Sequence, residues 1–285
     1  MSSVLSVPAL ISGVVLVSMV LLIFQKSSQI LSTQPLTDLL FSSSWQPIAG
    51  NFGFLPFIMG TIWVTGLAMI IAVPVSLLTA IYLSEYAHLY IRSIIQPVID
   101  LLAGIPSVVY GLFGILLIVP LIKNSIAPLF SITTSGYCIL AGGLVLAIMV
   151  FPILISISYE VIRTVPVEMR EASLGLGATR WETVKHVVMK KAFPGIVAAV
   201  ILGFSRAFGE TMAVLMVVGN VARVPESVFD PAYPIPALIA NNYGEMMSIP
   251  LYDSALMFAA FLLLIIIVAF NLAAKYVLVR LSVVT

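Results

Sequence analysis

The sequence predicts an all-α integral membrane protein with about six transmembrane helices and a folded loop on the cytoplasmic side. Of the 285 residues, 61% are hydrophobic and only 9% are charged, whereas an average soluble domain is roughly 25% charged. The hydrophobic residues gather in runs long enough to cross about 30 Å of hydrocarbon as helix. Most basic residues lie between these runs, on alternate connections, which is the pattern of a polytopic membrane protein.

The apolar runs define the expected crossings, each near or above roughly 20 helical residues. The expected spans are 8–24, 57–83, 94–122, 137–157, 193–219 and 254–277. The first run has no basic residue before it and no small-x-small cleavage site after it, so we expect an uncleaved helix there. No internal repeat or linker divides the chain, which indicates one transmembrane domain.

The basic residues predict the orientation, because Lys and Arg accumulate in short cytoplasmic loops. One side of the membrane receives only Lys26, Lys123 and Arg223. The other side receives Arg92, Arg163, Arg170, Arg180, Lys185, Lys190, Lys191, Lys275 and Arg280. This asymmetry places both termini and the 158–192 loop inside the cell, and the loops 25–56 and 220–252 outside as polar or proline-rich caps.

Several functional classes are disfavoured by the composition. A net charge of +1 without a basic cluster argues against nucleic acid binding. Cys138 is the single cysteine and has no thiol or histidine companion at metal-ligand spacing, so we predict neither a disulfide nor a metal site. The chain lacks a phosphate-cradling G-x-x-x-x-G-K-[ST] loop and any nucleophile and base constellation, so we expect no catalytic residues and no cofactor bound directly.

The largest inner loop has the pattern of two short helices. The first is expected to begin around Pro166 and to end at Gly175, where glycine can adopt the left-handed conformation that terminates helices. The second is expected after Gly177, because Thr179 and Glu182 have the spacing of a capping box. We therefore predict that a two-helix knuckle projects below the membrane.

Two charged residues lie inside the fifth expected span, where an ionisable side chain costs several kcal/mol unless it faces protein, water or a partner. Arg206 lies about thirteen residues into the span, roughly 20 Å along a helix. Glu210 follows at i+4, so we expect the two side chains on one helical face, able to neutralise each other. A guanidinium fork suits a tetrahedral oxyanion, and Thr211 adds a hydroxyl. The alternative is an ion pair that only pins the bundle.

The third expected span holds a candidate gate. Asp100 lies near its inner end, where an interfacial role is the alternative to gating. Pro106 is expected in the middle of this span, where it removes a backbone hydrogen bond and favours a kink, and Ser107 follows it.

The knuckle carries a family motif. Glu171-Ala172-Ser173, followed after three residues by Gly177, resembles the EAA loop of permeases from ABC importers, with Ser173 in place of the second alanine. The resemblance implies that this loop docks on a separate ATPase subunit, which uses ATP and Mg²⁺. It implies a coupling role for Glu171, Ala172, Ser173, Gly175, Gly177, Thr179 and Trp181.

Four stretches, one of which includes the EAA-like motif, resemble the PstC family of permeases from phosphate-specific ABC importers. They are Ile105 to Gly111, Arg206 to Asn220, Glu171 to Glu182 and Ile239 to Glu245. The resemblance implies a type I ABC importer permease fold in the cytoplasmic membrane of a prokaryote, with 57–285 as its core and 1–56 as the first helix and external loop. It also implies that Arg206, Glu210 and Thr211 lie on the phosphate path.

The same resemblance implies the partners. They are a PstA-like second permease, a PstB-like ATPase dimer, a PstS-like external phosphate-binding protein and membrane lipid. A permease for sulfate, molybdate or phosphonate is the nearest alternative, because an arginine does not separate these oxyanions. An ion-driven secondary transporter and a membrane-embedded signalling component are the alternatives from other classes.

Overall fold

The computed structural model describes residues 2–245 and 249–284. Within these residues six helices are long and apolar enough to cross a membrane, as the composition predicts. The candidate spans are Leu10–Thr33, Leu55–Tyr86, Ser107–Leu129, Ile139–Arg163, Arg180–Phe208 and Pro250–Tyr276. Residues 246–248 of the expected outer loop lie outside the described residues.

The elements follow one another as helices, with one short hairpin near the N-terminal end. The α-helices are α1 (Ser2–Thr33), α2 (Leu36–Phe41), α3 (Leu55–Ile81), α4 (Leu89–Ala103), α5 (Ser107–Phe113), α6 (Val119–Leu121), α7 (Ala127–Leu129), α8 (Ile139–Arg163), α9 (Val167–Gly175), α10 (Arg180–Thr183), α11 (Met189–Phe208), α12 (Met212–Leu215), α13 (Ile235–Asn242) and α14 (Pro250–Val284). The π-helical turns η2 (Tyr82–Tyr86), η3 (Gly114–Ile118), η4 (Ile122–Ile126) and η5 (Val184–Val188) extend or join them. The strands β1 (Trp45–Gln46) and β2 (Asn51–Phe52) pair antiparallel around the 3-10 turn η1 (Pro47–Ala49).

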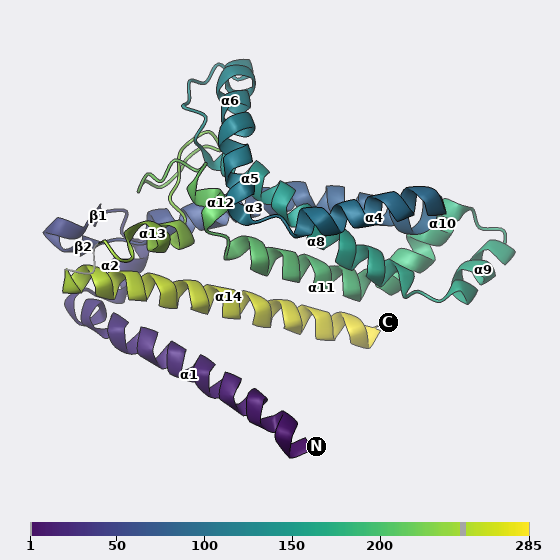
Figure 1. The fold of residues 1–285 in the computed structure, drawn as a ribbon, viewed down its shortest axis with the longest axis horizontal. Helices are drawn as coiled ribbons and strands as arrows, with labels where there is room; N and C mark the ends of the chain where they lie inside the picture. The colour runs from purple at the N-terminus through teal and green to yellow at the C-terminus, as the bar shows by residue number, and fades with distance from the viewer. Residues whose placement is uncertain (1, 246–248, 285) are drawn as a thin grey trace.

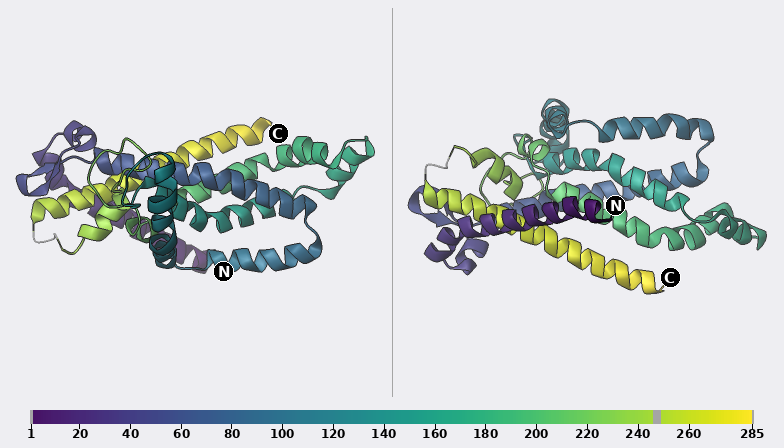
Figure 2. Two further views of the ribbon diagram at one scale, coloured as in Figure 1. Left: turned by 90° about the horizontal axis from the view of Figure 1, so that it is seen from above. Right: turned by 60° about the horizontal axis from the view of Figure 1, so that its bottom comes forward.

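The long helices run side by side along the molecule, with α8 at the centre (Figure 1). Helix α8 packs against α3, α11 and α4, and α1 packs against α14. The hairpin, α2 and α13 lie at one end of the bundle, and α9 and α10 at the other, in every view (Figures 1 and 2). The N-terminal end of α1 and the C-terminal end of α14 both point toward the end of the bundle that carries α9 (Figure 1). The two ends of the bundle are therefore built from different segments of the chain.

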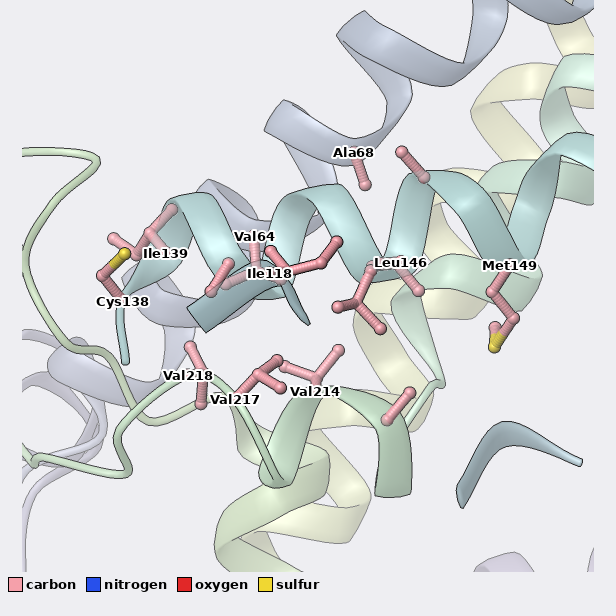
Figure 3. Packing of buried hydrophobic residues seen from close by; sticks show 14 of the residues in the cluster. Val64, Ala68, Ile118, Cys138, Ile139, Leu146, Met149, Val214, Val217 and Val218 are labelled. Atoms are coloured by element: carbon pink, nitrogen blue, oxygen red, sulfur yellow. The ribbon is translucent and has the colours of Figure 1, made fainter. Parts of the chain in front are cut away.

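The central core lies where α8 meets α3, η3 and α12 (Figure 3). Small residues permit the close approach of these helices. A side chain at Gly143 would have its Cβ 2.8 Å from Cδ2 of Leu67 on α3, and one at Gly203 would have its Cβ 2.6 Å from Cδ2 of Leu154 on α8. Close packing through small residues replaces the hydrophobic driving force that helices in lipid lack. Gly203 therefore has a packing role.

An aromatic cluster closes the hairpin end. Trp45 meets the ring of Phe57 at a centroid distance of 4.7 Å and that of Phe54 at 5.4 Å, with interplanar angles of 73° and 67°. Edge-to-face pairs of this kind contribute about 0.5–1.5 kcal/mol beyond their buried area. The same buried cluster includes residues of α13, which begins after Pro234, so the hairpin and α13 are packed together at this end.

The third expected span is wrong as a single helix. Helix α4 ends at Ala103, and α5 begins at Ser107 with Pro106 as its N-cap. In Figure 1 the α5–α6 segment rises steeply from the direction of α4. Pro106 therefore separates two helices rather than kinking one, because proline disfavours helical conformation in the residue before it and lacks the N–H that would continue the ladder. The candidate span begins only at Ser107.

The fifth expected span, 193–219, is displaced toward the knuckle. The helix runs without interruption from Arg180 through η5 and α11 to Phe208, a span of 29 residues. The second knuckle helix is therefore not a short separate element. Beyond Phe208 the chain forms only the single-turn α12 and then irregular backbone.

Candidate functional site

Arg206 lies in the last turn of α11, with its side chain exposed. The helix ends at Phe208, and Gly209 is its C-cap. Glycine is a poor helix former, so the chain leaves the helix here. Arg206 makes no side-chain hydrogen bond or ion pair among the described residues. Its guanidinium is free to receive a ligand.

Glu210 does not share a helical face with Arg206, so the prediction of a neutralising i, i+4 pair is wrong. The helix has ended before Glu210, and its Oε1 accepts a hydrogen bond from the backbone N–H of Ala213 at 3.3 Å. Thr211 donates its hydroxyl hydrogen to the carbonyl oxygen of Gly209 at 3.4 Å. The sequence rule failed because i, i+4 neighbours face each other only while the helix continues.

Glu210 lines a very small cavity, of about 10 Å³, between α3, α8 and α13. Two buried hydroxyl residues of α3, Thr61 and Thr65, line the same cavity. Thr61 accepts a hydrogen bond from the backbone N–H of Ile235 at 2.9 Å and donates one to the carbonyl oxygen of Phe57 at 2.7 Å. The first turn of α13 is thereby fixed to α3 beside the Glu210 carboxylate. Sequence reasoning missed Thr61 and Thr65, because threonine in an apolar helix carries no local signal.

Arg206 is close enough to Tyr110 for its guanidinium to interact electrostatically with the phenol group. Tyr110 is buried on α5, and its hydroxyl donates a hydrogen bond to the carbonyl oxygen of Leu102 at 2.8 Å. Tyr110 thus spans the break between α4 and α5. The structure therefore brings Arg206 near the segment in which the sequence places Pro106 and Ser107.

Asp100 lies in the last turn of α4 and is exposed. It lines a cavity of about 180 Å³ between α4 and α8, which Arg92, Gln96 and Glu160 also line. This cavity shares no residue with the one that Glu210 lines. The structure does not join Asp100 to the Arg206 region, and its gating role stays a prediction.

The knuckle has the predicted capping box. Thr179 accepts a hydrogen bond from the Glu182 backbone N–H at 3.3 Å, and Glu182 accepts one from the Thr179 backbone N–H at 2.7 Å. The first helix begins after Pro166, as expected. The left-handed residue is Gly177, with φ +88°, and not Gly175, which is the last residue of α9. The turn is therefore made two residues later than predicted.

The exposed surface of the knuckle is partly apolar. Leu176 is 90% exposed and Trp181 is 57% exposed. Glu171 and Ala172 are also exposed, whereas Ser173 is half-buried and its hydroxyl lies 2.9 Å from that of Thr183. Exposed large apolar side chains on a protruding loop are typical of a docking surface. The structure thus places the EAA-like residues where a partner can reach them.

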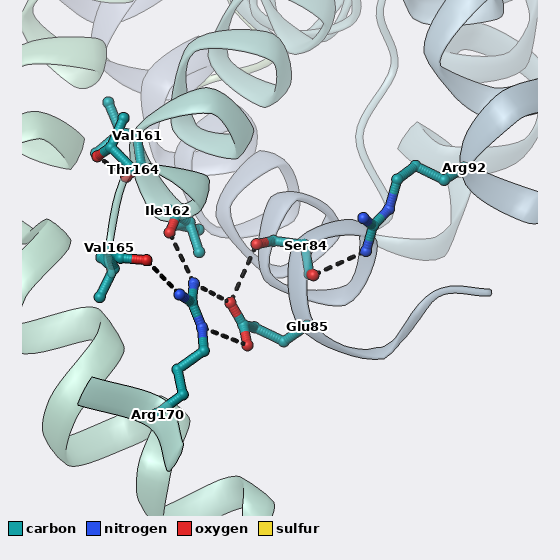
Figure 4. A network of polar contacts seen from close by, with 8 residues as sticks. All are labelled: Ser84, Glu85, Arg92, Val161, Ile162, Thr164, Val165 and Arg170. Carbon is teal, nitrogen blue, oxygen red and sulfur yellow. Dashed lines mark hydrogen bonds and ion pairs between the residues drawn. The ribbon is translucent and has the colours of Figure 1, made fainter. Parts of the chain in front are cut away.

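An ion pair between distant segments was not predicted. Arg170 on α9 donates to Glu85 on η2 through two hydrogen bonds, of 2.8 Å to Oε1 and 3.3 Å to Oε2 (Figure 4). The two side chains are only 19% and 12% exposed. The residues lie 85 positions apart, and sequence spacing reveals pairs only within one helix or one turn.

The six candidate spans and the protruding knuckle are those of a multi-pass membrane protein. Residues 72–283 match the family described as "Binding-protein-dependent transport system inner membrane component". The chain belongs to this family.

Individual relatives are more specific. The chain is 39% identical over 256 residues to the "Phosphate transport system permease protein PstC" of Xylella fastidiosa, covering 85% of this chain and 78% of the relative. It is 34% identical over 258 residues to the "Probable phosphate transport system permease protein PstC" of Methanocaldococcus jannaschii, with coverage of 85% and 82%. A third relative is the "Probable ABC transporter permease protein YqgH" of Bacillus subtilis, at 39% identity over 241 residues and coverage of 84% and 76%.

Solved structures support the fold. A chain of the MetNI methionine ABC transporter in an inward facing conformation aligns with a TM-score of 0.61 at 16% identity, covering 78% of this chain and 93% of that one. A bacterial ABC transporter that imports the acidic polysaccharide alginate aligns with a TM-score of 0.57 at 16% identity, covering 87% of each chain. The all-α, type I ABC importer permease fold is confirmed.

Proposed function

We propose that this chain is the permease subunit of an ATP-driven importer that carries inorganic phosphate across the cytoplasmic membrane. The observation that carries the proposal is the likeness, at 34–39% identity over most of the chain, to relatives named as PstC phosphate permeases. Arg206 at the end of α11, which makes no ion pair with any other described residue, supplies the chemistry, because a guanidinium offers a planar fork of donors to an oxyanion.

In this proposal Arg206 is the attractive charge on the path. An ion must bind favourably enough to enter and weakly enough to leave. Arg206 is exposed on this chain, so an ion can reach its guanidinium without first breaking an ion pair with another described residue. Thr211 lies next to the break at Gly209 and adds a hydroxyl to the same region.

The Glu210 carboxylate favours phosphate as the substrate over oxyanions that carry no proton. A phosphate ion at neutral pH retains at least one O–H and can donate it to a carboxylate, whereas sulfate has no proton to donate. Only one oxygen of Glu210 is used by the Ala213 N–H, so the other remains able to accept. We therefore expect Glu210→Gln to weaken phosphate uptake more than it weakens any uptake of sulfate.

The partners and the orientation belong to the same proposal. The knuckle faces the cytoplasm and docks on a PstB-like ATPase through Leu176, Trp181 and the Glu171 surface. A PstA-like permease completes the bundle, and a PstS-like binding protein delivers phosphate to the hairpin end. Both termini are then cytoplasmic, which agrees with the common direction of α1 and α14 and with the distribution of basic residues.

The test is uptake of radiolabelled phosphate by proteoliposomes that contain the assembled transporter, with ATP inside. We expect phosphate uptake by the wild type and its loss in Arg206→Gln at equal assembly, whereas Arg223→Gln, which removes an exposed outer-loop charge, serves as the matched control. Transport of sulfate or molybdate in place of phosphate would overturn the substrate assignment. Unchanged uptake by Arg206→Gln would remove this residue from the path.

A further inference from the structure

Helix α9, the first helix of the knuckle, is almost unsupported by packing. None of its residues from Val167 to Gly175 is buried. Its connection to α8 is short, and Ser173 reaches only the neighbouring knuckle residue Thr183. Helix α9 packs on α10 and η5, and its position relative to α3 and α8 depends on polar contacts.

Arg170 provides those contacts to two membrane helices at once. Its Nε and one terminal nitrogen donate to the Glu85 carboxylate, at the end of the α3–η2 helix. Its terminal nitrogens also donate to the carbonyl oxygens of Ile162, at 3.0 Å, and Val165 (Figure 4). These carbonyls lie at or just beyond the C-terminal end of α8, where helical C=O groups lack partners and the dipole favours a cation.

Glu85 is itself held in place. Its Oε1 accepts a hydrogen bond from the Ser84 hydroxyl at 3.1 Å, and the Ser84 carbonyl oxygen accepts one from Arg92 on α4 at 2.9 Å. The network therefore reaches α3, α4, α8 and α9 through residues that are mostly shielded from water (Figure 4). A shielded charged pair depends strongly on both partners, because removing one leaves an uncompensated charge.

We propose that Arg170 and Glu85 are positioning residues that make α9 move as one body with the ends of α3 and α8. This inference rests on the proposed function, because it assigns the pair to the transmission of ATPase motion into the bundle. The outer surface of α9 remains available for docking, since Arg170 points to the bundle while Glu171 and Ala172 are exposed. The pair therefore lies between the docking surface and the membrane helices.

The test measures phosphate transported per ATP hydrolysed in reconstituted transporter, a ratio that the amount of folded protein does not change. We expect Arg170→Gln to lower the ratio about tenfold while ATP hydrolysis persists, within the roughly 5–150-fold range of energetic couplings between sites. Glu85→Gln should lower it similarly, and the double variant should be no worse than either single one. Arg163→Gln is the matched control, because Arg163 is an exposed arginine on the last turn of α8 that contacts Tyr159 instead of α9.

A second readout does not depend on phosphate. In wild type, we expect ATPase binding to slow amide hydrogen exchange both in α9 and in η2; in Arg170→Gln the effect should stay in α9. Arg170→Lys keeps the positive charge but loses the planar fork of donors. We therefore expect its effect on both readouts to lie between those of the wild type and Arg170→Gln. Equal transport ratios in wild type and variants, or exchange in η2 that responds without Arg170, would overturn the inference. If the wild type carries no phosphate but the exchange link depends on Arg170, the proposed substrate fails and the positioning role stands.

Discussion

Two glycines of the knuckle provide a sharp test, because the structure predicts opposite effects for them. Gly177 has φ +88°, whereas Gly175 is the last residue of α9 and has no positive φ. A Cβ at either position would meet nothing within 4 Å, so steric clashes do not contribute. The difference between the two sites is therefore one of backbone conformation alone.

The magnitude follows from this conformation. A residue with a Cβ pays about 1–2 kcal/mol in the left-handed region, so Gly177→Ala should reduce the population of the ordered turn about 5–30-fold relative to alternatives. Gly177→Val should cost more, because a β-branched residue is poorly tolerated at positive φ. Gly177→Asn should recover much of the order, since asparagine tolerates this region. Gly175→Ala should instead stabilise α9 by up to about 1 kcal/mol through helix propensity.

The assays are amide hydrogen exchange over the turn between α9 and α10, and ATP hydrolysis by the assembled transporter. We expect faster exchange and weaker ATPase stimulation in all three Gly177 variants. The effect should be smallest in Gly177→Asn, larger in Gly177→Ala and largest in Gly177→Val, with membrane insertion unchanged. A harmful Gly175→Ala beside a silent Gly177→Val would refute the assignment of the left-handed turn. Uptake that remains normal in Gly177→Val would count against the docking role of the knuckle.

The remaining predictions concern packing and burial. Gly203→Leu should destabilise the bundle by about 1–3 kcal/mol, because its Cβ would lie 2.6 Å from Cδ2 of the buried Leu154. Thermal unfolding in detergent measures this loss of stability. Gly13→Leu is the control, because a Cβ at Gly13 would meet nothing within 4 Å. Cys138 is fully buried and burial raises the pKa of its thiol, so a maleimide should label it only after unfolding; rapid labelling of the native protein would contradict its position. Thr61→Val leaves the Ile235 N–H without its acceptor and should lower the stability of this contact by about 1–3 kcal/mol. The loss should appear as faster hydrogen exchange in α13. Thr79→Val, on the exposed side of α3, should leave that exchange unchanged.

The sequence predicts the fold where the signal is local. Apolar runs predict the six candidate spans, because the length of a spanning helix is set by the bilayer. The capping box of Thr179 and Glu182 is also correct, since both hydrogen bonds join residues three positions apart. The start of α9 after Pro166 is also correct, because the preference of proline for the beginning of a helix is a local property.

The errors arise where a helix stops inside an apolar run. Hydropathy continues through Pro106 and through Gly209, but the backbone leaves the helix at both places. The expected Arg206 and Glu210 pair fails with the second of these breaks. The contacts of Arg170 with Glu85, and of Thr61 with Ile235, lie beyond local reasoning, because they join residues 85 and 174 positions apart.

Helix α3 connects the two regions that the proposals assign to coupling and to transport. It continues through η2 as one 32-residue helix from Leu55 to Tyr86. Thr61, beside the Glu210 cavity, and Glu85, bound to Arg170, are 24 residues apart, which corresponds to about 36 Å along a helix. Helix α3 packs along α8, so a shift at its knuckle end is passed along their shared interface, with Pro74 and the π-helical turn η2 as the points at which α3 can bend. A displacement of the knuckle would thus arrive at Thr61 and α13, and would alter the surroundings of Glu210 without any direct contact between the ATPase and the transport path.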